Sequence, residues 1–295
     1  MDLLSLGFTR RSIDPAYAKT TAGKHSSLTI KPCIMIQFDK GPGAAFVKHF
    51  AALPDHTDIK NNFWYDWGPV FYRGRLDGSA KIILVASDPG PTERIAGRTL
   101  VGNAGQRVQG FLQKIGLTQS YTCVNGWAFA LHPSHLGDGI KLLSRPDLTT
   151  WRNKLFNMLK KPSLQAIVAF GDVAKKTVQL WDTKGNIPVF ETYHPSYHSG
   201  GAAGEKKMLT DWNRVVTALR GIITPDEGAA TNKPLYGDKF AEQDYAAIPA
   251  LDLPFGIPDW FGNDAFFRKK RGMNSVSRPS PDDGHTLLWK APKFN

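Results

Sequence analysis

The sequence predicts an α/β protein, a three-layer α/β/α sandwich around a central, mostly parallel, four-stranded sheet. Short apolar runs of strand length alternate along the chain with longer segments whose apolar residues recur at helical spacing. This alternation is typical of a parallel sheet that is covered by helices on both faces. The sequence shows no internal repeat, and one α/β domain is expected.

Four apolar runs are expected to form the strands of the sheet. They lie at residues 80–85, 121–124, 164–170 and 187–193. Each run is rich in β-branched or aromatic residues, and residues that favour turns follow it. The preceding stretch, residues 63–75, is aromatic-rich and punctuated by glycine, so we expect a packed loop there.

Five segments are expected to be helical, at residues 43–53, 101–115, 149–159, 173–181 and 205–219. In the second segment the apolar residues fall on one helical face, and Gly116 is expected to end the helix. Asp172 is expected to cap the start of the fourth, because a short polar side chain can accept the unpaired backbone N–H groups there.

The domain is expected to occupy residues 1–224, including an N-terminal extension. Residues 225–295 are rich in proline, glycine and isolated aromatic residues, which predicts a C-terminal extension that wraps or flanks the domain. Trp260, Phe261, Phe266 and Phe267 are its expected anchors.

The chain is strongly basic, with a net charge of +11 and a pI near 9.6. Such a charge favours a polyanionic partner, DNA or RNA first and an acidic membrane surface second. The densest basic run is Arg268-Lys269-Lys270-Arg271. It can serve nucleic acid or be an ordinary solvated surface.

A cytoplasmic location, in the bacterial cytoplasm or nucleoid, is expected. No apolar run approaches the roughly 20 residues that span a bilayer, and the N-terminus lacks the features of a secretory signal. The two cysteines, Cys33 and Cys123, cannot build a disulfide framework or a four-cysteine metal cluster. We expect no membrane partner, and we expect a monomer.

Two short motifs stand where buried strands are expected to end. Ala86-Ser87-Asp88-Pro89-Gly90 follows the first run, and His194-Pro195-Ser196 follows the fourth. The carboxyl ends of parallel strands form the rim at which open α/β sheets build their sites. A carboxylate and an imidazole that face a common crevice can cleave a bond through a cationic transition state.

Several other chemistries lack their sequence patterns. The dinucleotide pattern G-x-G-x-x-G after a strand, the P-loop pattern and the Gly-x-Ser-x-Gly elbow are missing. His194 and His198 have the spacing of helical metal ligands, but their loop is rich in proline and glycine and has no acidic third ligand nearby. We therefore expect no metal, and a zinc site is the lesser alternative.

A longer stretch lies between the two motifs, Gly97-Arg98-Thr99-Leu100-Val101-Gly102-Asn103-Ala104-Gly105-Gln106, and the second strand then ends at Asn125. In this order and spacing, residues 64–221 resemble the uracil-DNA glycosylase superfamily, in a branch without an iron–sulfur cluster and with an atypical first motif. The resemblance implies an enzyme that flips a nucleotide out of the DNA duplex and cuts its N-glycosidic bond.

The resemblance also implies roles for individual residues. Asp88 would orient a water and stabilise the sugar cation, and His194 would donate a hydrogen bond to the base O2 as it becomes anionic. Asn125 would recognise the base edge through its paired donor and acceptor. The alternatives are that Asp88 is a turn residue, His194 a simple loop residue and Asn125 a strand-end cap.

Further residues correspond to the DNA-contacting parts of the family. Ser196, Tyr197 and His198 stand where relatives insert a loop into the duplex and contact phosphates. Arg98 and Arg107 are expected clamps on the DNA backbone.

Departures from the family pattern bear on the substrate. The cluster-binding cysteines are missing, so no cofactor is expected. Gly90 replaces the tyrosine that excludes 5-substituted pyrimidines in strict uracil enzymes. Leu100 corresponds to an aromatic residue that stacks on uracil in the iron–sulfur branch, although Leu100 can equally be core. With Ser87 and Gly126 also small, the pocket is expected to admit a modified or 5-substituted pyrimidine.

Hypermodified cytosine of phage DNA is one such target, which would make the enzyme a defence factor. No lysine accompanies the motifs, so a monofunctional enzyme that leaves an abasic site is expected. The alternatives are an ordinary uracil-DNA glycosylase of base-excision repair, a non-catalytic DNA-binding relative, and a phosphohydrolase or nucleotide-binding enzyme of the same architecture.

Overall fold

The computed structural model describes residues 38–197, 199–254, 276–277 and 288–289. The chain divides into two units, Met1–Met35 and Ile36–Asn295, and every described residue belongs to the second. The predicted roles of His198, of the basic run at residues 268–271 and of the aromatic anchors at residues 260–267 lie outside the described residues.

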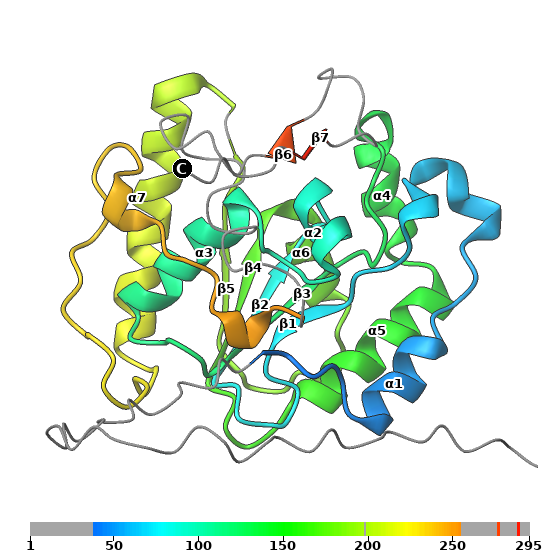
Figure 1. Ribbon diagram of the computed structural model, residues 1–295, viewed down its shortest axis with the longest axis horizontal. Coiled ribbons are helices and arrows are strands. Elements are labelled where there is room, and N and C mark those ends of the chain that lie inside the picture. Colours follow the sequence, from blue (N-terminus) through cyan, green and yellow to red (C-terminus); the bar gives the residue numbers. More distant parts are fainter. Residues whose placement is uncertain (1–37, 198, 255–275, 278–287, 290–295) are drawn as a thin grey trace, which may run out of the picture. The chain divides into compact units, whose positions relative to one another are not determined.

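A five-stranded sheet forms the centre of the described unit (Figure 1). Its strands are β1 (Tyr72–Gly74), β2 (Ile82–Ala86), β3 (Tyr121–Asn125), β4 (Ala166–Phe170) and β5 (Val189–Thr192). The order is β1-β3-β2-β4-β5; β2 to β5 are mutually parallel, and β1 pairs antiparallel with β3. A further pair, β6 (Val276–Ser277) and β7 (Leu288–Trp289), is antiparallel.

The α/β class and the mostly parallel sheet are confirmed, but the expected number of four strands is wrong. The additional strand β1 is only three residues long, and it lies in the segment that we expected to be a loop. Because so short a strand shows no alternating pattern, only its pairing with β3 reveals it.

Helices cover both faces of the sheet. Five of them match the predicted segments: α1 (Ala44–Ala51), α3 (Asn103–Lys114), α5 (Pro146–Leu159), α6 (Gly171–Gln179) and α7 (Gly201–Arg220). Two short ones were not predicted, α2 (Pro91–Ala96) and α4 (Leu136–Leu142). Five 3-10 turns complete the described elements: η1 (Thr57–Asn62), η2 (Tyr65–Trp67), η3 (Pro133–His135), η4 (Glu242–Asp244) and η5 (Ala250–Asp252).

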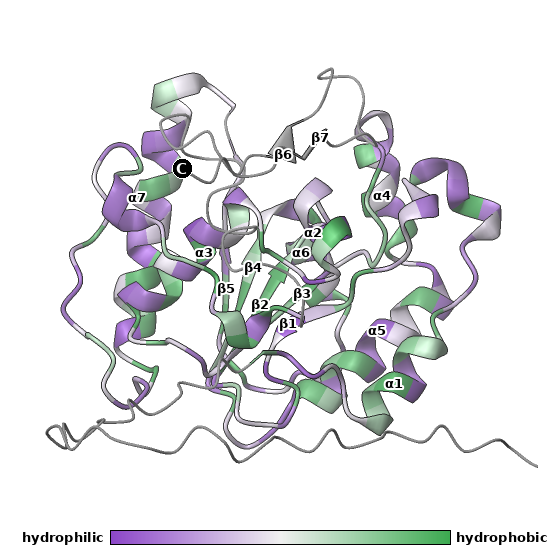
Figure 2. Ribbon diagram, viewed as in Figure 1, coloured by the Kyte–Doolittle hydropathy of each residue, from purple (hydrophilic) through white to green (hydrophobic). Residues whose placement is uncertain are grey.

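Alternating residues of each strand supply two separate cores. On one face Ile82 and Leu84 of β2 pack with apolar residues of α3 and α7, whereas on the other face Ile83 and Val85 pack with residues of α1, α5 and α6. Figure 1 places α3 and α7 on one side of the sheet and α1 and α5 on the other, and Figure 2 shows the apolar strands between them. The result is three layers.

Two local predictions have different outcomes. Gly116 follows the end of α3 with a φ of +76°, a left-handed conformation that glycine adopts without strain, as expected of a helix stop. Asp172 does not cap α6, because the helix already begins at Gly171 and the capping position is Phe170. Asp172 lies in the first turn instead, where its negative charge still interacts favourably with the helix dipole.

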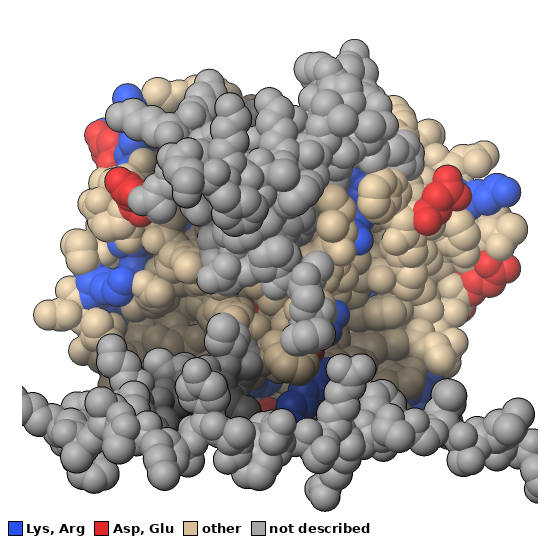
Figure 3. All heavy atoms as spheres, viewed as in Figure 1, with Lys and Arg blue, Asp and Glu red and all other residues tan. Residues whose placement is uncertain are grey.

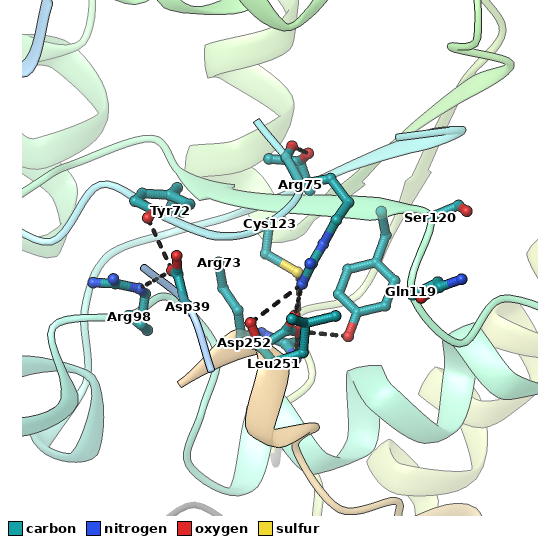
Figure 4. A network of polar contacts seen from close by, with 12 residues as sticks. Asp39, Tyr72, Arg73, Arg75, Arg98, Gln119, Ser120, Cys123, Leu251 and Asp252 are labelled. Carbon is teal, nitrogen blue, oxygen red and sulfur yellow. Dashed lines mark hydrogen bonds and ion pairs between the residues drawn. The ribbon is translucent and has the colours of Figure 1, made fainter. Parts of the chain in front are cut away.

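Buried ion pairs bind residues 225–254 to the sheet and to α3. Asp252 lies between Arg73, Arg75 and Tyr121, and the carboxylate contacts all three side chains (Figure 4). Lys114 of α3 pairs with Asp244 at 2.8 Å. Removing one partner of such a buried pair leaves an unpaired buried charge, which costs about 3–5 kcal/mol. This part of the chain is therefore firmly held.

Candidate active site

Four polar or flexible positions follow one another along the carboxyl-end rim of the sheet. Asn125 is the last residue of β3, Asp88 lies two residues after β2, Gly171 follows β4, and His194 lies two residues after β5. The register pairs Ala86 with Asn125, and neighbouring strands are about 4.8 Å apart. Asp88, Asn125 and His194 therefore share one rim.

Asp88 is half-buried and is held by neighbouring donors. The Leu131 N–H donates a hydrogen bond of 2.9 Å to Oδ2, and the Ser87 side chain donates another. Burial is the largest cause that raises the pKa of the Asp88 carboxyl, to about 6, and the nearby charge of Glu93 adds to it, while the two hydrogen bonds oppose the rise. The group is thus a carboxylate at neutral pH that protonates under mildly acidic conditions.

His194 is fixed in one tautomer. The Ser196 N–H donates to Nδ1 at 3.2 Å, so in the neutral ring the proton resides on Nε2. Burial lowers the pKa of His194 to about 4, which keeps the ring neutral at physiological pH. Gly171 permits this placement, because a Cβ there would lie 3.0 Å from the His194 Cβ. The ring is a neutral hydrogen-bond donor.

The Asn125 carboxamide is buried without a partner. Neither its Oδ1 nor its Nδ2 has a hydrogen-bond partner among the described residues. Leaving a buried polar group unpaired costs about 1–3 kcal/mol, and such groups are uncommon in folded proteins. One acceptor and one donor together match the edge of a nucleobase or another amide.

The two arginines expected to clamp DNA both have partners within the protein. Arg107 donates to the Pro195 carbonyl oxygen at 2.6 Å, and Arg98 pairs with Asp39 at 2.7 Å. Arg98 also lies over the Tyr72 ring, at 4.8 Å from its centroid. On the face drawn in Figure 3, the visible Lys and Arg side chains lie in separate small groups and form no single patch.

A known protein family matches the part of the chain that contains these site residues. Residues 73–216 match the family model of the Uracil DNA glycosylase superfamily. Residues 73–216 form a uracil DNA glycosylase superfamily domain. No curated protein matches the chain. The glycosylase domain runs from β1 into α7 and contains Asp88, Asn125 and His194, and its family implies a DNA glycosylase-like role.

Tyr197 and Ser196 follow His194 in the loop of the glycosylase domain. The Tyr197 N–H donates to the His194 carbonyl oxygen at 2.8 Å, and the Tyr197 ring lies 4.7 Å from that of Tyr193. Ser196 is exposed. These contacts make a compact turn, and the roles of both residues on DNA remain predictions.

The small residues of the glycosylase domain do not all leave space in the pocket. A Cβ at Gly126 would lie 2.5 Å from Thr177 Oγ1 and 2.9 Å from Val173 Cγ1, so this glycine faces the packing against α6. The expectation that Gly126 enlarges the pocket is therefore wrong. A Cβ at Gly90 would lie 2.6 Å from Glu93 Oε2, so a carboxylate borders that glycine.

Glu93 is a buried residue that sequence analysis missed. Its Oε1 accepts the N–H groups of Val101 and Gly102, each at 2.8 Å, and it thereby fixes the chain before α3. No local signal distinguishes Glu93 from an ordinary surface glutamate, because its partners come eight and nine residues later and meet it only through a turn.

Leu100 lies in the core of the glycosylase domain. It is 4 % exposed and packs in the same cluster as Val108 and Phe170. Its φ of 55° is left-handed, a conformation that a leucine adopts only under strain. This placement favours the core interpretation over a contact with the base.

Among the described residues, no helix is both long enough and apolar enough to cross a membrane. Within the same residues, His, Cys, Asp and Glu side chains form no group of three or more that could hold a metal ion.

Proposed function

We propose that the protein is a monofunctional DNA glycosylase that flips a pyrimidine nucleotide and hydrolyses its N-glycosidic bond, leaving an abasic site. The observation that carries this proposal is the unpaired, buried carboxamide of Asn125 on the same rim as Asp88 and His194. A flipped base would satisfy both atoms of the carboxamide at once.

Asp88 and His194 would each stabilise one of the two charges that develop as the bond breaks. When the C1′–N1 bond breaks, the electron pair leaves with the base and the sugar becomes cationic. The Asp88 carboxylate would stabilise that cation and orient the attacking water, while the His194 Nε2–H would donate to the base oxygen that gains negative charge. The water adds to C1′, and its proton finally neutralises the base.

His194 would act without giving up its proton. Burial holds its pKa near 4, so the ring is neutral and the Nε2–H is a fixed dipole that needs no reorganisation. Asp88 has the complementary property, since it is ionised above about pH 6. The charge states of both groups thus suit a neutral pH.

The proposed substrate is a modified or 5-substituted pyrimidine, with hypermodified cytosine of phage DNA as one candidate and defence as the corresponding role. Ser87 supports it because its side chain is small. The Glu93 carboxylate beside Gly90 further favours a substituent that donates a hydrogen bond, such as a hydroxymethyl group. Plain uracil is the second candidate, since the same three polar groups serve it equally.

The deciding experiment measures base release from DNA duplexes that each contain one uracil, 5-hydroxymethyluracil, 5-hydroxymethylcytosine or glucosylated cytosine. Release of a 5-substituted base faster than uracil is expected, together with alkali-labile abasic sites. Efficient release of uracil alone would overturn the substrate proposal, and no release from any duplex would overturn the function.

Two variants and one trapping reaction test the roles. Asp88→Asn and His194→Ala should each slow base release by about a hundredfold or more while DNA affinity stays within about threefold. Full activity of both variants would contradict the site. Borohydride should trap no covalent complex, because the proposed nucleophile is water.

A further inference from the structure

The tripeptide His-Pro-Ser occurs twice at the rim of the sheet. His194-Pro195-Ser196 follows β5, and His132-Pro133-Ser134 lies in the connection between β3 and α4. In both turns the histidine Nδ1 contacts the serine two residues later. Ser196 N–H donates at 3.2 Å in the first, and in the second Ser134 N–H lies at 3.4 Å and Ser134 Oγ at 2.6 Å.

The shared geometry favours the same tautomer in both rings. A backbone N–H that donates to Nδ1 favours the tautomer whose proton resides on Nε2 and points away from the turn, and in the second turn the Ser134 hydroxyl then also donates to Nδ1. The surroundings differ. The environment of His194 desolvates the ring, whereas His132 is half-buried and followed by two exposed residues, Pro133 and Ser134.

Two paired segments hold His132 beside an aromatic ring. The His132 N–H donates to the Asn62 carbonyl oxygen and the Trp64 N–H donates to the Ala130 carbonyl oxygen, both at 2.8 Å. The His132 ring consequently lies 4.5 Å from the Trp64 ring, at 44° to it. His135 adds a third ring, 5.7 Å from that of His132.

This ring cluster borders the proposed reaction centre. Leu131, whose N–H donates to Asp88 Oδ2 at 2.9 Å, immediately precedes His132, and consecutive Cα atoms are about 3.8 Å apart. The acidic side chain of Asp138 in α4 lies 3.6 Å from His135 and 3.5 Å from Lys141. Among the described residues, no carboxylate forms a hydrogen bond or ion pair with the His132 ring.

We infer that the second His-Pro-Ser turn binds a backbone phosphate of the DNA strand beside the flipped nucleotide. His132 Nε2–H donates to a phosphate oxygen, and the Trp64 ring holds the imidazole in place. Contacts to phosphate position a protein on DNA without reading sequence, and they come commonly from side-chain and backbone N–H groups. This inference rests on the proposed function, because it takes DNA as the partner.

The test separates binding from chemistry. Single-turnover base release is measured against enzyme concentration for the full chain, using a duplex that carries the best substrate base. His132→Ala should raise the half-saturating concentration about tenfold and change the maximal rate by less than about twofold. His132→Gln, whose amide can still donate, should recover part of the affinity, and Lys161→Ala, beside Gly78 before β2, is the control for loss of a polar group elsewhere.

The phosphate itself is tested by neutralisation. In a set of duplexes, each phosphate flanking the substrate base is replaced in turn by a methylphosphonate. At one position the wild-type protein should lose about tenfold in affinity, and His132→Ala should lose nothing further there. Equal losses for both proteins at every position would overturn the inference, as would a lower maximal rate at an unchanged half-saturating concentration.

Failure of the proposed function gives a different pattern. If no duplex is cut, fluorescence anisotropy on the same duplexes still compares wild type with His132→Ala. Tighter binding by wild type that a single methylphosphonate abolishes would support the phosphate contact alone. Equal binding of all duplexes by both proteins would overturn it, and melting temperatures within a few degrees of wild type verify that the variants are folded.

Discussion

The Arg107 guanidinium donates a hydrogen bond of 2.6 Å to the carbonyl oxygen of Pro195, the residue that follows His194. The same guanidinium lies 3.3 Å from the Tyr245 hydroxyl and 4.2 Å from the centroid of the Phe240 ring. Helix α3 and the segment at 240–245 thus brace the loop that carries His194. The contact holds the loop backbone at Pro195, next to His194.

We expect Arg107→Met to lower the maximal rate of base release about tenfold and to leave the half-saturating DNA concentration nearly unchanged. Hydrogen bonds to a charged group contribute about 1.5–3 kcal/mol, and here the loss would loosen His194. Arg107→Lys should restore part of the rate, because a lysine can still donate to Pro195. If Arg107→Met instead weakens DNA binding and its salt dependence, Arg107 is the backbone clamp predicted from sequence.

The side chains that hold the site in place show what the sequence can and cannot predict. The strand ends that carry Asp88, Asn125 and His194 were predictable, because long apolar runs and the turns after them are local features. The partners of Arg98 and Arg107 lie 59 and 88 residues away in the chain, so nothing near either arginine reveals that each is bound internally. From the sequence alone, a basic residue in a DNA-binding motif is therefore predicted to contact DNA.

The rate of base release should follow the ionisation of Asp88. Burial and the charge of Glu93 raise the pKa of that carboxyl to about 6, and only the carboxylate stabilises a sugar cation. The maximal single-turnover rate should therefore rise with pH, with a midpoint near 6, and level off above it. His194 adds no loss in this range, since its pKa is about 4. A rate that is constant between about pH 5 and pH 8 would exclude Asp88 as the essential carboxylate.

Asp88 should also cost stability at neutral pH. Its pKa is higher in the folded state than the ordinary value of 3.8, so the folded state binds the proton more readily between about pH 4 and pH 6. Stability from this group therefore falls as the pH rises through that window. Asp88→Asn should be more stable than wild type by about 2–3 kcal/mol above pH 6 and equal to it below about pH 4.

Urea unfolding across this pH range measures the difference. Asp77→Asn is the control of opposite sign, because hydrogen bonds from Ser79 are the largest cause that lowers the pKa of Asp77. Its contribution is present above the ordinary pKa and is lost as the pH falls. An Asp88→Asn variant whose advantage does not change with pH would show that the carboxyl is not shifted.

Asn125→Ala should greatly slow base release without lowering the stability of the fold. Removing a buried carboxamide that has no partner relieves about 1–3 kcal/mol of unmet hydrogen bonding, which offsets the lost packing of the side chain. The variant should therefore unfold at a denaturant concentration at or above that of wild type, yet release base at least about a hundredfold more slowly. A large loss of stability would mean that the carboxamide is a structural cap at the end of β3.

Glycine near a site is ambiguous from sequence, because an absent side chain can leave room for a ligand or for the protein's own atoms. Gly126 is of the second kind, since Thr177 Oγ1 and Val173 Cγ1 occupy the space that its Cβ would need. Sequence analysis had no means to find this, as both atoms come from α6, about fifty residues later.

Gly126→Ala should therefore destabilise the fold by about 1–3 kcal/mol, the usual cost of overpacking, without changing which base is released. Thr177 Oγ1 is buried without a hydrogen-bond partner among the described residues, so Thr177→Ala removes the closer of the two obstructing atoms and breaks no hydrogen bond. The double variant should recover most of the stability, as a double-mutant cycle in urea would measure. If Gly126→Ala changes the relative rates for uracil and 5-substituted bases at an unchanged unfolding midpoint, this residue lines the pocket after all, and the packing argument is wrong.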